Sequence, residues 1–182
     1  MGSTYSNAVV VGVTSEQVVS ALGPAKAFVS PALNGVVVAF ARDDEESPGA
    51  GLGARQISST LDRPVLDVFV FDSDICSLQV LTNGEPRAAI VAPPEAMEEM
   101  DDDDGPVGMD PEVFAAEAVS ALGRGDEGVL VTALTTDVVF AEEAHRAVLA
   151  ALGLPVWPAG WGYRHLDQEQ PELACGPLLR IS

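Results

Sequence analysis

The sequence contains very little positive charge: Lys26 is its single lysine, beside eight arginines and two histidines. Aspartate and glutamate together number 28, so the formal net charge is −19. A surface of this sign repels nucleic-acid phosphates and anionic membranes. We therefore expect no nucleic acid and no membrane among the partners. If charge steers this chain to anything, we expect a basic protein.

Other absences exclude several classes of enzyme and metal protein. The two cysteines, Cys76 and Cys175, are far apart and form no CxxC pair, which argues against a disulfide framework or a zinc finger. No GxSxG nucleophile motif occurs. No apolar run approaches the roughly 18 residues needed to span a bilayer, and no signal peptide is visible at the start. We expect a cytoplasmic protein with two reduced thiols.

An acidic stretch, EAMEEMDDDDG at residues 95–105, is the most unusual segment. A calcium loop alternates its ligands along the chain, whereas consecutive carboxylates point in different directions and repel one another. Removing these seven acids from the total of −19 still leaves −12, so the whole surface is acidic. We interpret the stretch as a solvated linker, and contact with a basic partner is the alternative.

Hydrophobic patterning predicts an α+β fold with a mostly antiparallel sheet. The expected order in the first half is β-α-β-β-α-β, which matches the ferredoxin-like arrangement. Two turns, Asn34-Gly35 and Asn83-Gly84, supply the positive φ that tight hairpins need. The strands are expected at residues 8–13, 27–30, 36–40 and 65–71, with a further hairpin of 76–81 and 87–91, and the helices at 14–23 and 54–61.

After Pro94 the sequence becomes rich in helical patterns. Asp110-Pro111 begins one helix, and residues 140–152 form the clearest helix of the chain. Residues 129–134 fit either a strand or a short helix capped by Asp126, and residues 157–166 are expected to form a final strand or edge. We thus divide the chain into a β-rich part (1–94), an acidic linker (95–109) and a helical part (110–182), packed as one unit.

A short repeat leaves one alternative open. Val19-Ser20-Ala21-Leu22-Gly23 recurs as Val119-Ser120-Ala121-Leu122-Gly123, which two duplicated halves would produce. Helices also commonly end in Leu-Gly, so the repeat does not decide between duplication and chance.

Glu142 and His145 have the i, i+3 spacing found in half of a carboxylate-bridged di-iron site. The only other histidine, His165, belongs to no such motif, so we predict no metal and no cofactor. We interpret this helix as charged and solvent-facing. Gly49-x-Gly51-x-Gly53 lacks the Walker lysine and is interpreted as a loop. No residue is predicted to be catalytic.

Aromatic residues near the C-terminus are the best candidates for a recognition surface. Trp157, Trp161 and Tyr163 lie beside Arg164 and several glycines, a combination that suits partner binding. The same residues could instead seal a core. The predicted partner-binding set is Trp157, Trp161, Tyr163, Arg164, Glu142, Glu143 and His145.

Three segments, Phe140–Arg146, Ala151–Pro155 and Gly160-x-Gly162-Tyr163, resemble the C-terminal part of a group of uncharacterised bacterial proteins of actinobacterial type. The resemblance covers about the last quarter of the chain. It implies a helix at residues 129–134 and argues against duplication. It implies no activity.

These observations favour a non-enzymatic interaction protein, concretely a cytoplasmic immunity or inhibitor protein that neutralises a basic partner. One alternative is a small enzyme, or a ligand- or metal-binding protein, that uses Glu142, His145 and Tyr163. Another is an acidic DNA mimic. The oligomeric state stays open.

Overall fold

The computed structural model describes residues 2–45, 51–92, 108–169 and 171–182, and over these residues seven strands form one sheet. The strands are β1 (Tyr5–Val11), β2 (Ala27–Val29), β3 (Val36–Ala41), β4 (Val65–Phe71), β5 (Ile75–Thr82), β6 (Glu85–Ala92) and β7 (Leu179–Ile181). Their order is β6-β5-β4-β1-β3-β2-β7, with every neighbouring pair antiparallel. The predicted α+β class with a mostly antiparallel sheet is confirmed.

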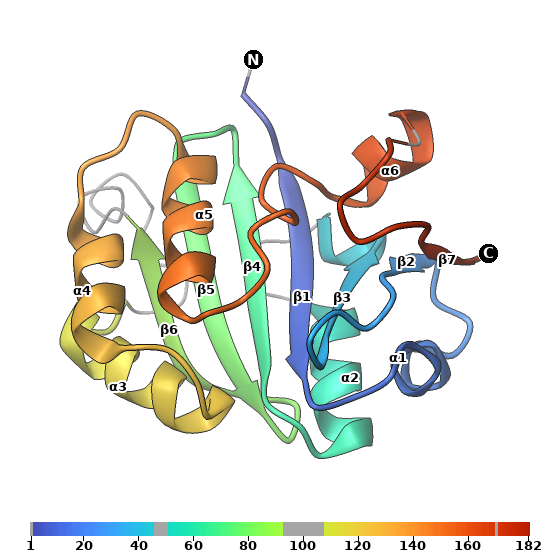
Figure 1. The fold of residues 1–182 in the computed structure, drawn as a ribbon, viewed down its shortest axis with the longest axis horizontal. Coiled ribbons are helices and arrows are strands. Elements are labelled where there is room, and N and C mark those ends of the chain that lie inside the picture. The colour runs from blue at the N-terminus through green and yellow to red at the C-terminus, as the bar shows by residue number, and fades with distance from the viewer. Residues whose placement is uncertain (1, 46–50, 93–107, 170) are drawn as a thin grey trace.

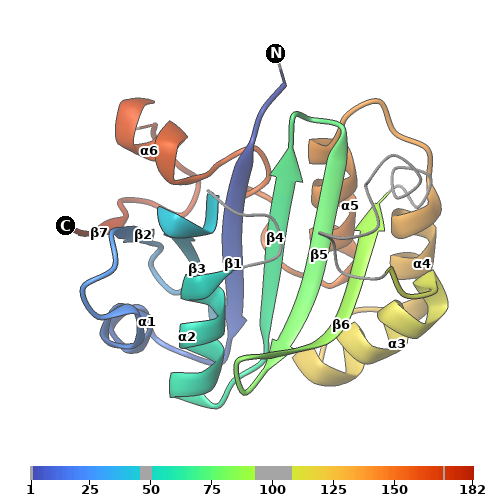
Figure 2. The same cartoon turned by 180° about the vertical axis from the view of Figure 1, so that it is seen from behind.

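Helices cover both faces of this sheet. They are α1 (Ser15–Leu22), α2 (Leu52–Leu61), α3 (Pro111–Leu122), α4 (Glu127–Thr135), α5 (Ala141–Ala151) and α6 (Tyr163–Glu169), with a short 3-10 helix η1 (Asp43–Glu45). Figure 1 shows α5 in front of β4 and β5, with α3 and α4 beside β6 and α6 beside β1 and β2. Figure 2 shows α2 on the opposite face.

The two covered faces explain why the central strands are largely apolar. In β1, Val9 faces the core under α3 to α6, and Val10 faces the core under α1 and α2. Alternate residues of a strand point to opposite faces, so a strand between two helical layers has apolar side chains at most positions. The continuous run in β1 therefore indicated a buried strand, and both valines have no exposed surface.

Both predicted Asn-Gly turns are confirmed. Asn34 and Gly35 have φ values of 52° and 74°, and Asn83 and Gly84 have 54° and 81°. Positive φ at both central residues matches the right-handed twist of the flanking strands. The turns set the β2–β3 and β5–β6 registers.

Two predicted helix starts are also confirmed. Thr14 caps α1 in a capping box: its Oγ1 accepts from the Gln17 N–H, and its own N–H donates to Gln17 Oε1. Asp110 caps α3 by accepting from the Glu112 N–H at 2.9 Å, with Pro111 as the first helical residue. Such caps satisfy amide donors that have no partner within the helix.

Residues 129–134, which the sequence left between strand and helix, belong to α4. Asp126 caps this helix by accepting from the Val129 N–H at 2.9 Å. Leu130, Ala133 and Leu134 form its buried side at helical spacing, and the exposed Val129 points outward. Burial at i, i+3 and i+4 outweighed the weak strand preference of the β-branched residues.

The expected final strand at residues 157–166 is wrong. The chain turns through Pro158 and through Gly160, whose φ is 94°, and then forms α6 from Tyr163 onward. Tyr163 and Leu166 are buried at helical i, i+3 spacing, which decides the segment in favour of a helix. The actual last strand, β7, pairs with β2 along Ala27–Val29 and was not predicted.

The second half does not repeat the first: within the described residues it adds four helices and the single strand β7 to the same sheet. Gly23 and Gly123 each follow a helix and have positive φ values of 58° and 65°, so the repeated Leu-Gly is a helix-ending signal.

In the first half, β4-β1-β3-β2 are adjacent, with α1 and α2 as connections. Its ferredoxin-like description stays a prediction. The acidic stretch 95–105 lies outside the described residues.

Candidate functional site

The three aromatic residues of the predicted recognition surface pack against the sheet. Trp157 is half-buried with its ring centroid 5.9 Å from that of Phe40, and Tyr163 is buried with its ring 5.2 Å from that of Phe28. Trp161 is also half-buried, and its carbonyl accepts from Asn7 Nδ2 at 3.2 Å. The rings mainly cover the sheet, which leaves a partner little aromatic surface.

Arg164 is the one member of that segment that is well exposed. Its guanidinium Nε lies 3.5 Å from Glu45 Oε2, and its backbone N–H donates to the same carboxylate. Burial nevertheless raises the pKa of Glu45 to about 7, because desolvation outweighs the attraction to Arg164. The contact fixes the start of α6 against η1.

The predicted residues of α5 lie in three different environments. Glu143 is exposed, Glu142 is half-buried, and His145 has no exposed surface. The i, i+3 spacing does place Glu142 and His145 toward the same side, but this side faces the protein interior. The interpretation of α5 as solvent-facing is therefore wrong for His145.

His145 is held by a buried hydrogen bond to β1. Its Nδ1 lies 2.9 Å from the Tyr5 hydroxyl, and the rings are stacked with centroids 5.8 Å apart. Desolvation lowers the pKa of His145 to about 3 and raises the pKa of Tyr5, so both groups are neutral at physiological pH. The third residue of the enzymatic alternative, Tyr163, packs on Phe28 instead.

A metal site is not formed by these residues. Across the ranges that the structure describes, no group of three or more His, Cys, Asp or Glu side chains could hold a metal ion. Cys76 is fully buried, as expected for a core thiol, and burial raises its pKa to about 12. Cys175 is half-buried in a turn near the C-terminus.

Ser73, in the β4–β5 turn, joins three segments at one edge of the molecule. Its carbonyl accepts from the Ala141 N–H at 2.7 Å, and its hydroxyl donates to Glu142 Oε1 at 2.7 Å. The Ser3 N–H donates to the same hydroxyl oxygen at 2.7 Å. The N-terminal segment, the β4–β5 turn and the start of α5 are therefore fixed relative to one another.

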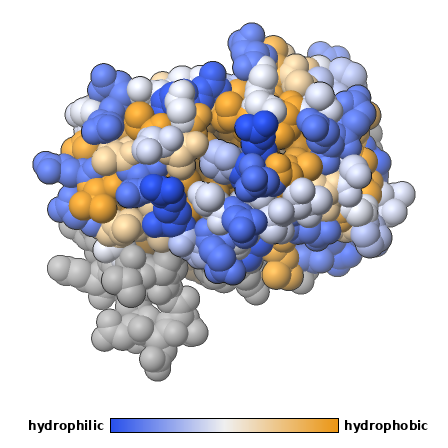
Figure 3. Space-filling model, turned by 90° about the horizontal axis from the view of Figure 1, so that it is seen from below, coloured by the Kyte–Doolittle hydropathy of each residue, from blue (hydrophilic) through white to orange (hydrophobic). Residues whose placement is uncertain are grey.

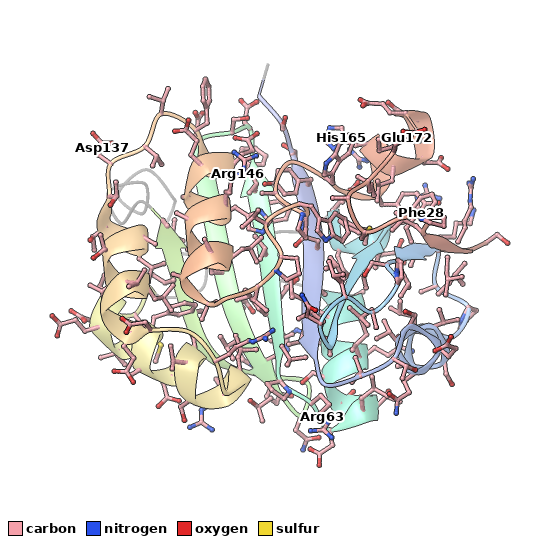
Figure 4. The ribbon with its side chains drawn as sticks, in the orientation of Figure 1. Phe28, Arg63, Asp137, Arg146, His165 and Glu172 are labelled. Atoms are coloured by element: carbon pink, nitrogen blue, oxygen red, sulfur yellow. The ribbon has the colours of Figure 1, made fainter. Side chains whose placement is uncertain are left out.

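Around Ser73 the surface combines carboxylates with large apolar side chains. Val139 is 78% exposed and Phe140 is 54% exposed, although both precede a helix that is otherwise well packed. We call this surface the acidic rim and define it by its exposed residues, which are Asp72, Asp74, Asp137, Val139, Phe140 and Glu143. Figure 4 shows Asp137 in the segment between α4 and α5, and Arg146 on α5.

Apolar surface on the face seen from below in Figure 3 is dispersed. In the view from below (Figure 3), hydrophobic residues are interspersed among hydrophilic ones, including on the left, beneath α3 and α4. On α3 and α4, Val113 and Val129 are exposed beside Glu112 and Glu127. Single exposed apolar residues are normal on any protein, so the adjoining pair Val139 and Phe140 in a hydrogen-bonded frame is the more informative feature.

Buried acids lie on the other face of the sheet, and no spacing in the sequence predicted them as a group. Asp67, on β4, pairs in register with Gln79 on β5, and Asp67 Oδ1 and Gln79 Oε1 are both buried without a hydrogen-bond partner in the described structure. Burial, and secondly the charge of Asp44, raises the pKa of Asp67 to about 8. Asp44 accepts from the Gly53 N–H at 2.8 Å. The sequence feature that could have predicted this site is a charged residue, Asp67, within an otherwise apolar strand.

No protein-family model, curated protein or solved structure matches this chain. The resemblance to uncharacterised actinobacterial proteins therefore stays a prediction. Within the described residues, the structure contains no helix with the length and apolar character that crossing a membrane requires.

Proposed function

We propose that this chain is a non-enzymatic interaction protein that binds a basic protein partner through the acidic rim. The observation that carries the proposal is the exposure of Val139 and Phe140 among the carboxylates of Asp72, Asp137 and Glu143. An immunity or inhibitor protein acting in the cytoplasm is the concrete form of this function.

The chemistry of the rim favours such a partner. An apolar anchor such as Phe140 supplies the desolvated centre of an interface, and the surrounding charges select the partner and speed its approach. The net charge of −19 adds long-range attraction for a cationic protein. The hydrogen bonds at Ser73 hold the rim in place before binding, which lowers the entropic cost of association.

The test begins with capture of partners from the native lysate on the immobilised protein at low salt. Captured proteins are identified by mass spectrometry and bound again in purified form. We expect a basic protein whose affinity falls about tenfold or more in the Phe140→Ala variant, as for an interface anchor. A matched control is Leu52→Ala, because Leu52 is 61% exposed on α2, away from the rim.

The charge contribution is tested separately. Asp137→Asn with Glu143→Gln should lower the association rate several-fold. Asp62→Asn with Glu85→Gln changes the net charge equally but alters exposed carboxylates outside the rim. If no basic protein is retained, or if both pairs of variants act equally, the rim is not the binding surface.

The same experiment distinguishes a DNA mimic from an immunity or inhibitor protein. A partner of a DNA mimic would be a DNA-binding protein, and duplex DNA would compete with this chain for it. A partner that duplex DNA does not displace would instead support the immunity or inhibitor form.

A further inference from the structure

Positive charge in this chain is concentrated at one place. Only nine residues are lysine or arginine, yet four of them, Lys26, Arg42, Arg164 and Arg180, line one pocket of about 410 Å³. Tyr163, Asp167 and Gln168 complete its lining. We call it the cationic pocket.

The sheet and α6 bring these cations together from distant parts of the sequence. Lys26 precedes β2 and Arg42 follows β3, and the Arg42 N–H donates to the Lys26 carbonyl at 2.9 Å. Arg180 lies on β7, in register with Phe28 of β2. Arg164 is near the start of α6, which packs against β1 and β2. Strand pairing thus forms the pocket.

Two of the cations form ion pairs, and two form none among the described residues. Arg164 pairs with Glu45 at 3.5 Å, and Arg180 pairs with Asp167 at 2.6 Å. Lys26 and Arg42 take part in no ion pair within the ranges that the structure describes. The pocket therefore carries a surplus of positive charge that an added anion would compensate.

An apolar pocket adjoins the cationic one. It has a volume of about 340 Å³ and is lined by Phe28, Leu166, Pro171, Pro177, Leu178 and Arg180. Arg180 borders both pockets, and its guanidinium lies 5.4 Å from the centre of the Phe28 ring. Figure 4 places Phe28 beside α6 and β7, at the opposite side of the molecule from Asp137. A ligand here would meet positive charge at one end and apolar surface at the other.

We propose that the cationic pocket binds a small organic phosphate monoester, with its phosphate near Lys26 and Arg42 and its apolar part against Phe28 and Leu178. Arginine presents a planar set of N–H donors that matches phosphate oxygens, and lysine adds a compact charge. The overall charge repels anions at long range, but this repulsion is screened beyond about 10 Å at 0.1 M salt. Among the residues that line the pocket, four cations stand against one carboxylate, that of Asp167. This proposal does not depend on the acidic rim.

The test is a titration of the full chain with phenyl phosphate, followed by backbone amide chemical shifts. Inorganic phosphate and phenol serve as probes for the two halves of the ligand. We expect shifts at residues 26–28, 42, 163–168 and 178–180, with phenyl phosphate binding several-fold more tightly than either probe.

Two variants locate the phosphate. Arg42→Gln and Lys26→Gln should each weaken phenyl phosphate binding about five- to tenfold. Arg63→Gln is the matched control, because it removes one charge from an exposed arginine that does not line the pocket and lies after α2, well away from the labelled Phe28 in Figure 4. Unchanged amide spectra away from the substituted residue verify that each variant is folded.

Three results would overturn the proposal. Phenyl phosphate could cause no shifts at the pocket, or Arg63→Gln could weaken binding as much as Arg42→Gln, which would indicate a general charge effect. Equal affinity for inorganic phosphate and phenyl phosphate would remove the apolar part of the site and with it the proposed ligand class.

Discussion

The two faces of the sheet bury ionisable side chains in opposite ways. Under α5, His145 is a base kept neutral by burial, with its pKa lowered to about 3, and it has the Tyr5 hydroxyl as a partner. Under α2, Asp67 is an acid kept neutral up to about pH 8, and its Oδ1 has no hydrogen-bond partner in the described structure. Each face avoids a buried charge, but within the described residues only His145 is hydrogen-bonded, through Nδ1, and its Nε2 has no partner.

The two faces consequently respond to pH with opposite sign. His145 titrates at about 3 when folded and near 6.5 when unfolded, so the unfolded state binds more protons between these values, and stability falls as pH falls through this window. Asp67 titrates at about 8 when folded and near 3.8 when unfolded. Its folded form binds more protons in between, so stability falls as pH rises from 3.8 toward 8.

The largest effect is expected from Asp67→Asn. This variant cannot ionise, and its amide offers a donor to the unpartnered Gln79 Oε1. We expect the free energy of unfolding to increase by about 2–3 kcal/mol at pH 8, less at pH 5, and hardly at all below pH 4. Chemical denaturation at the three pH values measures this.

The control for Asp67→Asn is Asp62→Asn, which changes the net charge equally at an exposed residue after α2. It should alter the free energy of unfolding only slightly at any of these pH values. A gain from Asp67→Asn that is independent of pH would show that Asp67 is not a buried titrating group.

A smaller effect of opposite sign is expected on the α5 face. Tyr5→Phe removes the hydroxyl and leaves His145 Nδ1 buried without its partner, which should lower the free energy of unfolding by about 1–2 kcal/mol. Tyr163→Phe is a matched control, since Tyr163 is also buried and aromatic but its hydroxyl forms no hydrogen bond within the described residues. Equal destabilisation by both variants would argue against a specific contribution from the Tyr5–His145 bond.

The smallest effect concerns the coupling of Asp44 and Asp67. Burial raises the pKa of Asp44 itself, and the Asp44 charge contributes to the raised pKa of Asp67, so Asp44→Asn should stabilise the protein at pH 8 more strongly while Asp67 is present. A double-mutant cycle with Asp67→Asn should therefore give an interaction free energy of about 0.5–1 kcal/mol at pH 8. Strict additivity would mean that the two carboxylates do not interact.

Local sequence signals predicted most secondary structure. Residues 65–71 form β4 over the expected range, and both Asn-Gly turns and the Thr14 and Asp110 caps are as expected. These features depend on a few neighbouring residues, which the sequence shows directly. The strand predicted at residues 157–166 was wrong because the aromatic residues of this segment fit a strand as well as a packed turn and helix. Only their contacts with Phe28 and Phe40 decide between the two structures.

The candidate sites were much harder to predict. The expected set on α5 and at residues 157–164 combined side chains that the fold separates, since Glu143 is exposed while His145 is buried. Helical spacing identified the common side of Glu142 and His145, but not the layer that this side faces. The acidic rim and the cationic pocket are both formed by residues from several segments of the chain. Spacing along the sequence does not predict which of these distant segments come into contact.

The sequence alone determined the net charge, the antiparallel character of the sheet and the positions of turns and caps, because each depends on composition or on local backbone preferences. The tertiary structure alone decided that Lys26, Arg42 and Arg180 share one pocket, and that a histidine and an aspartate lie buried on opposite faces. Strand order and helix placement set these outcomes through contacts between residues far apart in the chain. They also fix the local dielectric, which decides the charge of each buried group.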